Sequence, residues 1–406
     1  PKGVHAQWAA SQVPMHCGVP WQAMAWRDKA GPQRMDDHSV SLQFFCTTWP
    51  AICTEAGLKE AKAFVGRHCG RVAIIADESH MMKNSSSMRH KRATAIKKEA
   101  KARYCMTLSG TPQAKDLEEE WAQLMWLDPA ILGITSKAAF RAEYAILGGF
   151  ENRSIVAHKN IEKFANLTSP YVFRASKDQL NLPPKLYENW EFDLSQEQTK
   201  RLQHLQRELE IEIDEGRVVD VEGALPYLLK AQQITNGFVL DEEGESFWLG
   251  ENPRVDALLE AIEAFGQEQA IIWSRFRQDH AFVVSALGEG NCVQYHGGTS
   301  ASERKQAVEK FMAGEARYFV ASPQSGGTGL NLAGRCHLAI YYSNSFNSID
   351  RWQSEDRLHR IGTKDAVLCV DLIARKSVDK TLTDNLKSKR SFVDLALSDA
   401  LRGFAR

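Results

Sequence analysis

Five short apolar runs in the C-terminal part of the chain constrain the fold more than any other feature. They are Ala270–Phe276, Asn291–His296, Ala316–Ser322, His337–Ser343 and Val367–Ile373. Stretches with helical periodicity lie between some of them, at Glu303–Met312 and Ser348–His359. Strands that alternate with helices form a parallel sheet with crossover helices. The pattern predicts one doubly wound α/β domain over residues 250–406.

The N-terminal part repeats this pattern less completely. It predicts strands at Leu42–Thr47, Val72–Asp77 and Tyr104–Leu108, and a helix at Val4–His16 that no strand precedes. We therefore expect a first domain over residues 1–128 whose front edge is missing. Residues 129–249 show mostly helical periodicity, including a long charged helix at Gln196–Glu215, and we expect a helical region between the two domains.

Composition excludes several classes of protein. The 406 residues are 43% apolar and 25% charged, as in ordinary globular proteins. No apolar stretch approaches the roughly 20 residues of a membrane span, and no signal peptide is visible at the start. The eight cysteines form no Cys-x-x-Cys pair, which favours a reducing cytoplasm over a disulfide or zinc framework. With a net charge of −1, nucleic acid would have to bind in a local basic cleft.

Two acidic residues follow a buried strand. The apolar run at 72–76 ends in Asp77 and Glu78, and ligands of doubly wound sheets bind at the carboxyl ends of strands. In a phosphate-handling site, Asp77 would hold Mg²⁺ and Glu78 would accept a proton from the attacking water. The alternative is a pair of solvated carboxylates at the end of a strand.

Two turns lie at the ends of other strands. Ser109-Gly110-Thr111-Pro112 follows the strand at 104–108, and its hydroxyl groups can exchange hydrogen-bond partners, although such a motif alone is often only a turn. The run Ser325–Leu332 has three glycines, Gly326, Gly327 and Gly329, which let a ligand approach the backbone closely. A flexible loop is the alternative.

Arg357 and Arg360 lie three residues apart, on one side of a helix or helix end. Arginine is always charged and forks onto phosphate oxygens, so the pair is a candidate for contact with a γ-phosphate. A surface helix with ion pairs to Glu355 and Asp356 would carry the same residues. The segment Lys83–Arg103 holds eight basic residues against one acid, which suits either contact with DNA phosphates or a solvated helix.

The ordered set of these segments resembles superfamily-two helicases, and most closely the Swi/Snf-type translocases in their compact phage and bacterial form. Asp77-Glu78-Ser79-His80 resembles the DEAH box, Ser109–Pro112 motif III, Ser325–Leu332 motif V, and Gln353–Gly362 motif VI. The first eight residues are similar to motif Ia, and Trp273–Arg275 to motif IV. Leu182–Lys185 fits the stretch between the lobes. The family's usual Gln is Thr363 in this chain.

The resemblance implies an α/β fold of two RecA-like parallel-sheet lobes, the first incomplete, joined by a helical inter-lobe region. It implies ATP and Mg²⁺ as cofactors and duplex DNA, bound without sequence preference, as the partner. Membrane attachment is not implied, and protein partners are left unknown. The residues implied for catalysis are Glu78, Arg357 and Arg360; for metal, Asp77; for ATP, Asp77, Glu78, Gly327, Gly329, Arg357 and Arg360; for coupling, Ser109, Thr111 and Gln353; for DNA, Lys2, Ser274, Arg275 and Thr328.

One departure from the family matters. The phosphate loop Gly-x-x-x-x-Gly-Lys-Ser/Thr should precede motif Ia, yet the sequence contains no Gly-Lys dipeptide. Because the chain also starts with Pro1, we expect a fragment of a DNA-dependent ATPase in the cytoplasm of a bacterium or phage-infected cell, inactive by itself. The alternatives are a nucleic-acid-binding module that hydrolyses no ATP, or an RNA helicase or restriction-type motor.

Overall fold

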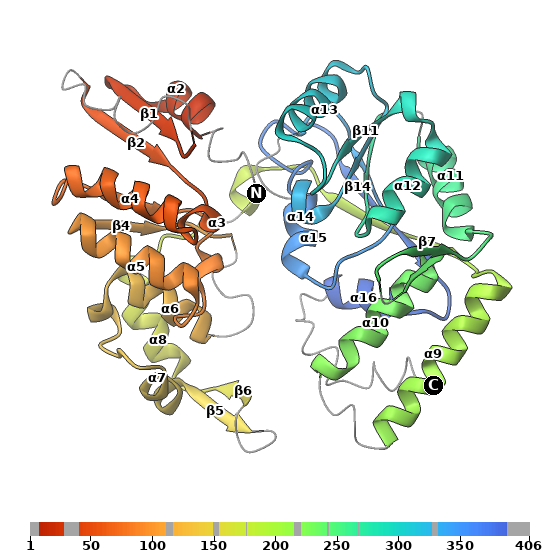
Figure 1. The fold of residues 1–406 in the computed structure, drawn as a ribbon, viewed down its shortest axis with the longest axis horizontal. Coiled ribbons are helices and arrows are strands. Elements are labelled where there is room, and N and C mark those ends of the chain that lie inside the picture. Colours follow the sequence, from red (N-terminus) through yellow and green to blue (C-terminus); the bar gives the residue numbers. More distant parts are fainter. Residues whose placement is uncertain are drawn as a thin grey trace. The chain divides into compact units, whose positions relative to one another are not determined.

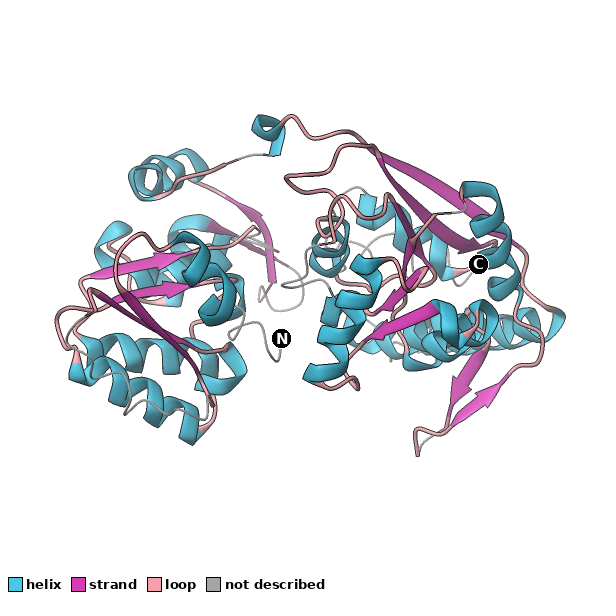
Figure 2. Cartoon of the chain, turned by 90° about the horizontal axis from the view of Figure 1, so that it is seen from above, coloured by secondary structure: helices cyan, strands magenta, loops and turns pink. Residues whose placement is uncertain are grey.

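The chain divides into two compact units, Pro1–Ala175 and Ser176–Arg406 (Figure 1). The computed structural model describes residues 8–27, 40–110, 117–148, 154–175, 177–214, 221–241, 243–266, 268–326 and 332–387. Figure 2 distinguishes the helices and strands of both units by colour. None of the described helices combines the length and the apolar character that crossing a membrane requires.

The first unit contains two pairs of parallel strands with helices around them. β1 pairs with β2, and β3 pairs with β4. The strands are β1 (Trp21–Ala25), β2 (Leu42–Cys46), β3 (Ala73–Ala76) and β4 (Tyr104–Thr107), and the helices are η1 (Trp8–Gln12), α2 (Val13–His16), α3 (Trp49–Ile52), α4 (Glu55–Arg67), η3 (Ser79–Met82) and α5 (Met88–Ala100). Phe64 of α4 and Ile96 of α5 belong to one apolar core with Val72 and Ala76, so these helices pack against the strand that leads to Asp77.

The rest of the first unit is a small helical subdomain with one hairpin. Its elements are α6 (Leu117–Leu127), η4 (Pro129–Ile131), α7 (Lys137–Tyr144), β5 (Ala145–Gly148), β6 (Ser154–His158), α8 (Ile161–Thr168) and η6 (Ser169–Tyr171). Fully buried Phe140 lies against the rings of Trp121, Tyr144 and Phe164, which fixes these helices together.

The second unit is built on a six-stranded sheet in which every pair of neighbours is parallel, in the order β11-β12-β10-β13-β14-β7. The strands are β7 (Lys185–Phe192), β10 (Ala270–Trp273), β11 (Cys292–Tyr295), β12 (Tyr318–Ala321), β13 (Leu338–Tyr341) and β14 (Val367–Ala374). A hairpin, β8 (Phe238–Leu240) and β9 (Ser246–Trp248), lies outside this sheet. The helices are η7 (Lys177–Leu180), α9 (Gln196–Asp214), α10 (Val221–Thr235), α11 (Pro253–Phe265), α12 (Arg277–Leu287), η8 (Glu289–Asn291), α13 (Ala301–Ala313), α14 (Pro323–Gly326), α15 (Ser348–Glu355) and α16 (Val378–Lys387).

Both faces of the six-stranded sheet are covered. Along β10, Ile272 belongs to a core with Leu258 of α11 and Val283 of α12, whereas Ile271 belongs to a second core with Phe311 of α13. Successive side chains of a strand point to opposite faces, so the helices cover both faces of the sheet. This is the doubly wound arrangement that the apolar runs predict, and the α/β fold class is confirmed.

The structure corrects the number and place of the strands. All five runs predicted for the sheet are strands, but a sixth strand, β7, pairs over its whole length with β14 from within the region expected to be helical. Its sequence mixes charged and apolar residues because it is an edge strand, and Leu186 and Tyr187 are exposed. β1 and the hairpins β5–β6 and β8–β9 were also not predicted. The boundaries proposed after residues 128 and 249 stay predictions, and the contacts group residues 176–249 with the second unit.

Candidate functional site

The acidic pair lies where β3 ends and the chain turns sharply. Glu78 has a left-handed backbone conformation, with φ of 50°, and this turns the chain directly from the strand into η3. The indole N–H of Trp49 donates to the Asp77 carbonyl oxygen at 2.9 Å, and the Glu78 N–H donates to Asp77 Oδ1 at 2.9 Å. The backbone of the pair is therefore held from two sides.

The charge of the pair suits a bound cation. Partial removal of the Asp77 carboxyl group from water raises its pKa, and the negative charge of Glu78 raises this pKa further. A divalent cation beside these oxygens would offset both effects. Mg²⁺ in nucleotide sites takes one or two carboxylates and completes its octahedron with water and phosphate. The residues that the structure describes contain no group of three metal-ligating side chains.

His80 connects the acidic pair to the turn after β4. Its Nδ1 lies 3.2 Å from Glu78 Oε2 and 3.3 Å from Ser109 Oγ. The backbones are joined as well, because Ser79 N donates to the Leu108 carbonyl oxygen at 2.9 Å. The structure therefore brings together two of the predicted segments, and Ser109 is placed where its hydroxyl group reaches the carboxylate through one histidine. Thr111, the other coupling residue predicted in this turn, lies outside the described residues.

Two further residues, Gln123 and Trp49, support this site and were not found by sequence reasoning. Ser79 is almost fully buried, and its hydroxyl group donates to Gln123 Oε1 of α6 at 2.6 Å. Trp49 of α3 holds the Asp77 carbonyl group, as described above. Both partners are distant in sequence from the acidic pair, and no local pattern marks them.

The predicted arginine pair lies in a turn and not on a helix. Helix α15 ends at Glu355, and residues 356–362 form turns and bends. The Nε of Arg357 donates to the Gln353 carbonyl oxygen at 3.2 Å, and Arg360 has an exposed side chain. We name residues 356–363 the arginine turn. Of the predicted residues, Gln353 and Arg357 are in contact, while Asp77 and Glu78 lie in the other unit.

Thr363 closes the arginine turn. Its hydroxyl group donates to the Leu358 carbonyl oxygen at 2.6 Å and accepts from Arg360 N at 3.1 Å. These bonds satisfy backbone groups that a longer helix would otherwise pair, which explains why the predicted helix to His359 stops early. Leu332 N donates to the Arg357 carbonyl oxygen at 3.3 Å, so the chain leaving the glycine-rich segment lies beside the turn. Gly327, Thr328 and Gly329 lie outside the described residues.

The residues predicted to contact DNA differ in how far they are buried and in whether the structure describes them. Ser274 is fully buried in this structure, and its predicted contact with DNA stays a prediction. Arg275 is half-buried: its Nη1 donates to Gln232 Oε1, and its guanidinium lies 4.6 Å from the centre of the Phe346 ring. Removal from water lowers the pKa of Arg275 to about 10, so it keeps its charge at neutral pH. Lys2 lies outside the described residues.

Part of the basic segment 83–103 is used inside the protein. Arg92 pairs with Glu55, and Lys83 pairs with Glu119 at 2.6 Å. Lys97 donates to the carbonyl oxygens of Trp126 and Leu127. These three residues anchor the segment to its neighbours, and a role in DNA binding stays a prediction for the others.

Two family models match the chain. Residues 16–238 match the SNF2-related domain, and residues 253–362 match the helicase conserved C-terminal domain. The first match contains the acidic pair and the Ser109 turn, and the second contains the arginine turn up to Gly362.

Curated relatives are similar over most of this chain. The putative ATP-dependent helicase/translocase YwqA of Bacillus subtilis is 28% identical over 333 residues, which cover 79% of this chain and 35% of that protein. Transcription regulatory protein SNF2 of Saccharomyces cerevisiae is 25% identical over 345 residues, 78% of this chain and 20% of that protein. The chain thus spans about a third or less of the length of these relatives.

Among solved structures, the Sulfolobus solfataricus SWI2/SNF2 ATPase core in complex with dsDNA matches with a TM-score of 0.42 and 21% identity. The match covers 99% of this chain and 82% of that chain.

Proposed function

We propose that this chain, which belongs to the SNF2-related family, forms the motor domains of an ATP-driven translocase that moves along duplex DNA. One observation carries the proposal: Glu78, His80 and Ser109 form a continuous set of contacts at the end of β3. A carboxylate that could act on water is thereby tied to a turn that can change its hydrogen bonds. Such a connection would let a conformational change accompany hydrolysis.

Each site residue has a distinct role in this proposal. Asp77 would hold Mg²⁺, and Glu78 would position the attacking water and take its proton. Arg357 and Arg360 would stabilise the charge on the transferring phosphoryl group, a contribution of about 10³–10⁵ in rate for an arginine finger. Gly327 and Gly329 would let the backbone approach the nucleotide. Ser109, Thr111 and Gln353 would couple the state of the bound nucleotide to closure of the lobes.

The lysine that neutralises the β- and γ-phosphates is missing from these 406 residues, since no Gly-Lys dipeptide occurs. We propose that hydrolysis needs such a lysine from elsewhere, and that the full-length product of the gene is the active enzyme. The curated relatives, which are more than twice as long, are consistent with this.

For DNA, we propose contacts with the phosphate backbone through Lys2, Arg275 and Thr328. Phosphate contacts carry no sequence information, so binding would be independent of sequence and would weaken as salt rises. The basic residues of 83–103 that are not anchored within the protein are further candidates.

Displacement of a third DNA strand tests the movement itself. The full-length gene product is mixed with a duplex that carries a triplex-forming strand, ATP and Mg²⁺. We expect the third strand to be released only with hydrolysable ATP, because a motor that tracks duplex DNA strips it off. Hydrolysis of ATP without release of the strand would contradict movement along the duplex.

A second function is favoured by the missing Gly-Lys sequence: the chain could bind nucleic acid without hydrolysing ATP. Measurable ATP turnover by the 406-residue chain alone would rule this out. An RNA helicase or a restriction-type motor is the third candidate. Comparing duplex DNA, single-stranded DNA and RNA as activators of the full-length ATPase separates these, and the proposal requires duplex DNA to be the strongest activator.

A further inference from the structure

Asn344, just after β13, joins three segments of the second unit that are distant in sequence. It is 7% exposed. Its backbone carbonyl oxygen accepts from Gln232 Nε2 of α10 at 2.8 Å. Its side-chain Nδ2 donates to Asp371 Oδ1 of β14 at 2.8 Å, and its Oδ1 accepts from Arg351 Nη1 of α15 at 2.9 Å. Both ends of the amide group are engaged, so any shift of one neighbour acts on the other two.

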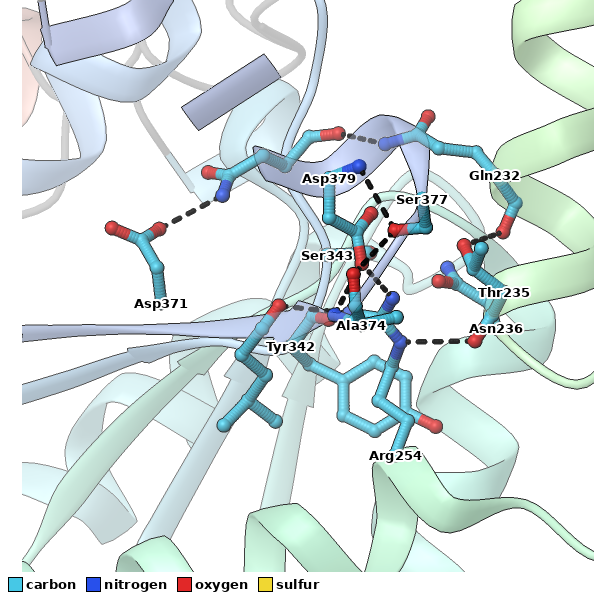
Figure 3. Close-up of polar contacts among 12 residues, drawn as sticks. Gln232, Thr235, Asn236, Arg254, Tyr342, Ser343, Asp371, Ala374, Ser377 and Asp379 are labelled. Carbon is cyan, nitrogen blue, oxygen red and sulfur yellow. Dashed lines mark hydrogen bonds and ion pairs between the residues drawn. The ribbon is translucent and has the colours of Figure 1, made fainter. Parts of the chain in front are cut away.

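On one side, these contacts lead to Arg275. The side chain of Gln232 is fully buried, and its Oε1 accepts from Arg275 Nη1 while its Nε2 donates to Asn344. Figure 3 labels Gln232 and Asp371, and a dashed line marks a polar contact of each. Gln232 therefore connects the Arg275 guanidinium to the Asn344 backbone.

On the other side, the contacts lead into the arginine turn. Arg351 is buried, and its guanidinium forks onto both carboxylate oxygens of Asp371. Its Nε donates to Glu355 Oε1 at 2.7 Å. The backbone carbonyl oxygen of Glu355 accepts from the N–H groups of Leu358 and His359, at 3.1 and 3.0 Å. Two backbone hydrogen bonds of the arginine turn are thus accepted by a residue that Arg351 holds.

The buried charges make this connection stiff. Arg351 faces the carboxylates of Asp371 and Glu355, and Lys185 balances the second acid with its Nζ 2.8 Å from Glu355 Oε2. Tyr187 donates to the same oxygen at 2.9 Å. Two buried acids and two bases are paired, and moving one away would leave an unpaired charge inside the protein. The group therefore moves as a unit.

We infer that Gln232, Asn344 and Arg351 are positioning residues that couple the binding of a DNA phosphate at Arg275 to the arrangement of the arginine turn. The inference rests on the proposed function, in which Arg275 contacts DNA and Arg357 and Arg360 contact the nucleotide. A phosphate draws the Arg275 guanidinium away from Gln232 Oε1. Gln232 then loses one of its two fixed partners, its bond to Asn344 loosens, and the constraint on Arg351 and the turn weakens.

Amide hydrogen exchange of the 406-residue chain, with and without a duplex of random sequence, tests this coupling. In the wild type we expect duplex DNA to speed the exchange of backbone amides in residues 353–363 by at least about threefold. The same chain carrying Gln232→Met should bind the duplex within a factor of about two of the wild type and lose this response. Methionine keeps the volume of the buried side chain but makes neither hydrogen bond.

Ser377→Ala is the matched control. The Ser377 hydroxyl group is also buried in the second unit and donates to the Ala374 carbonyl oxygen at 2.7 Å, but it lies outside this set of contacts (Figure 3). It should keep the response to DNA. A purely structural role of Gln232 would change exchange equally with and without DNA, so the ratio of the two rates is the informative quantity.

A second variant, Asn344→Asp, places a carboxylate against Asp371 and should also lose the response, so the test does not depend on Gln232→Met folding well. Unchanged or slower exchange in the wild-type turn on DNA binding would overturn the inference and leave the proposed function standing. So would a response that survives in both variants. Failure of the wild-type chain to bind duplex DNA at all would overturn the proposed DNA contacts and the inference together.

Discussion

His280 and Arg254 show how burial decides the effect of a single polar residue. Arg254 is fully buried, yet its guanidinium donates to the carbonyl oxygens of Thr235, Tyr342 and Leu372 and pairs with Asp379 (Figure 3). His280 of α12 is 3% exposed, and neither of its ring nitrogens has a hydrogen-bond partner in the described part of the chain. Burial, with a smaller effect of His296, lowers the pKa of His280 to about 3. Arg254 therefore stabilises the second unit, whereas His280 lowers its stability in acid.

The direction of this pH effect on stability follows from the pKa values of His280 in the folded and unfolded chain. Unfolding returns His280 to a pKa near 6.5, so below that pH the unfolded chain binds a proton that the folded chain does not. Stability is therefore lost as the pH falls below 6.5. Between pH 8 and pH 5, we expect wild type to lose roughly 2 kcal/mol more of its unfolding free energy than His280→Leu does.

Urea denaturation at the two pH values measures this difference. His204→Leu, which removes an exposed histidine of α9, is the control and should keep the pH dependence of the wild type. An equal loss of stability in wild type and His280→Leu would show that His280 is not buried in its neutral form.

At the scale of elements, the sequence predicted those strands whose neighbours bury them on both faces. β10, β12 and β13 are buried at every position, and a continuous apolar run is a signal that the sequence shows directly. β7 carries Lys185, Glu188 and Glu191 among its apolar residues because only one of its edges is paired, and its role depends on β14, which is almost two hundred residues away.

In the candidate site, too, some residues could be predicted from the sequence and others could not. Asp77, Glu78, Arg357 and Arg360 stand out in the sequence because the acids follow an apolar strand and the two arginines lie three residues apart. The residues that hold these groups or their neighbours in the chain, such as Trp49, Gln123 and Arg351, matter because of tertiary contacts that no local sequence pattern shows. The spacing of Arg351 and Glu355, four residues apart on α15, was the one available local signal for the buried group beside the arginine turn.

The pairing of β7 with β14 predicts where the second unit can be cut. A polypeptide of residues 176–406 should fold with one cooperative thermal transition, because it contains all six strands of the sheet. A polypeptide of residues 250–406 lacks β7 and the helix α10, exposes the edge of β14, and removes the Lys185 and Tyr187 partners of Glu355. We expect it to aggregate, because open strand edges pair with other chains.

Circular dichroism melting and size-exclusion chromatography of the two polypeptides decide this point. A monomeric 250–406 polypeptide that melts as high as 176–406 would mean that β7 contributes little, and would support the boundary predicted from helical periodicity.

At the scale of the whole molecule, the chain carries two halves of one proposed function in two units. The first unit holds the acidic pair and its contact with Ser109, and the second holds the arginine turn and the contacts that lead from Arg275 to it. The SNF2-related and helicase C-terminal family matches account for both halves. In the proposed function, ATP hydrolysis depends on both units and on a phosphate-binding lysine.

The most direct test is the steady-state rate of ATP hydrolysis by the full-length gene product with and without duplex DNA. We predict that duplex DNA raises the rate at least tenfold, and that Glu78→Gln lowers the stimulated rate by about 10²-fold or more while duplex binding is kept, since the variant removes the proposed base without removing a DNA contact. A rate that duplex DNA leaves unchanged, or a Glu78→Gln variant that hydrolyses ATP as fast as the wild type, would contradict the account.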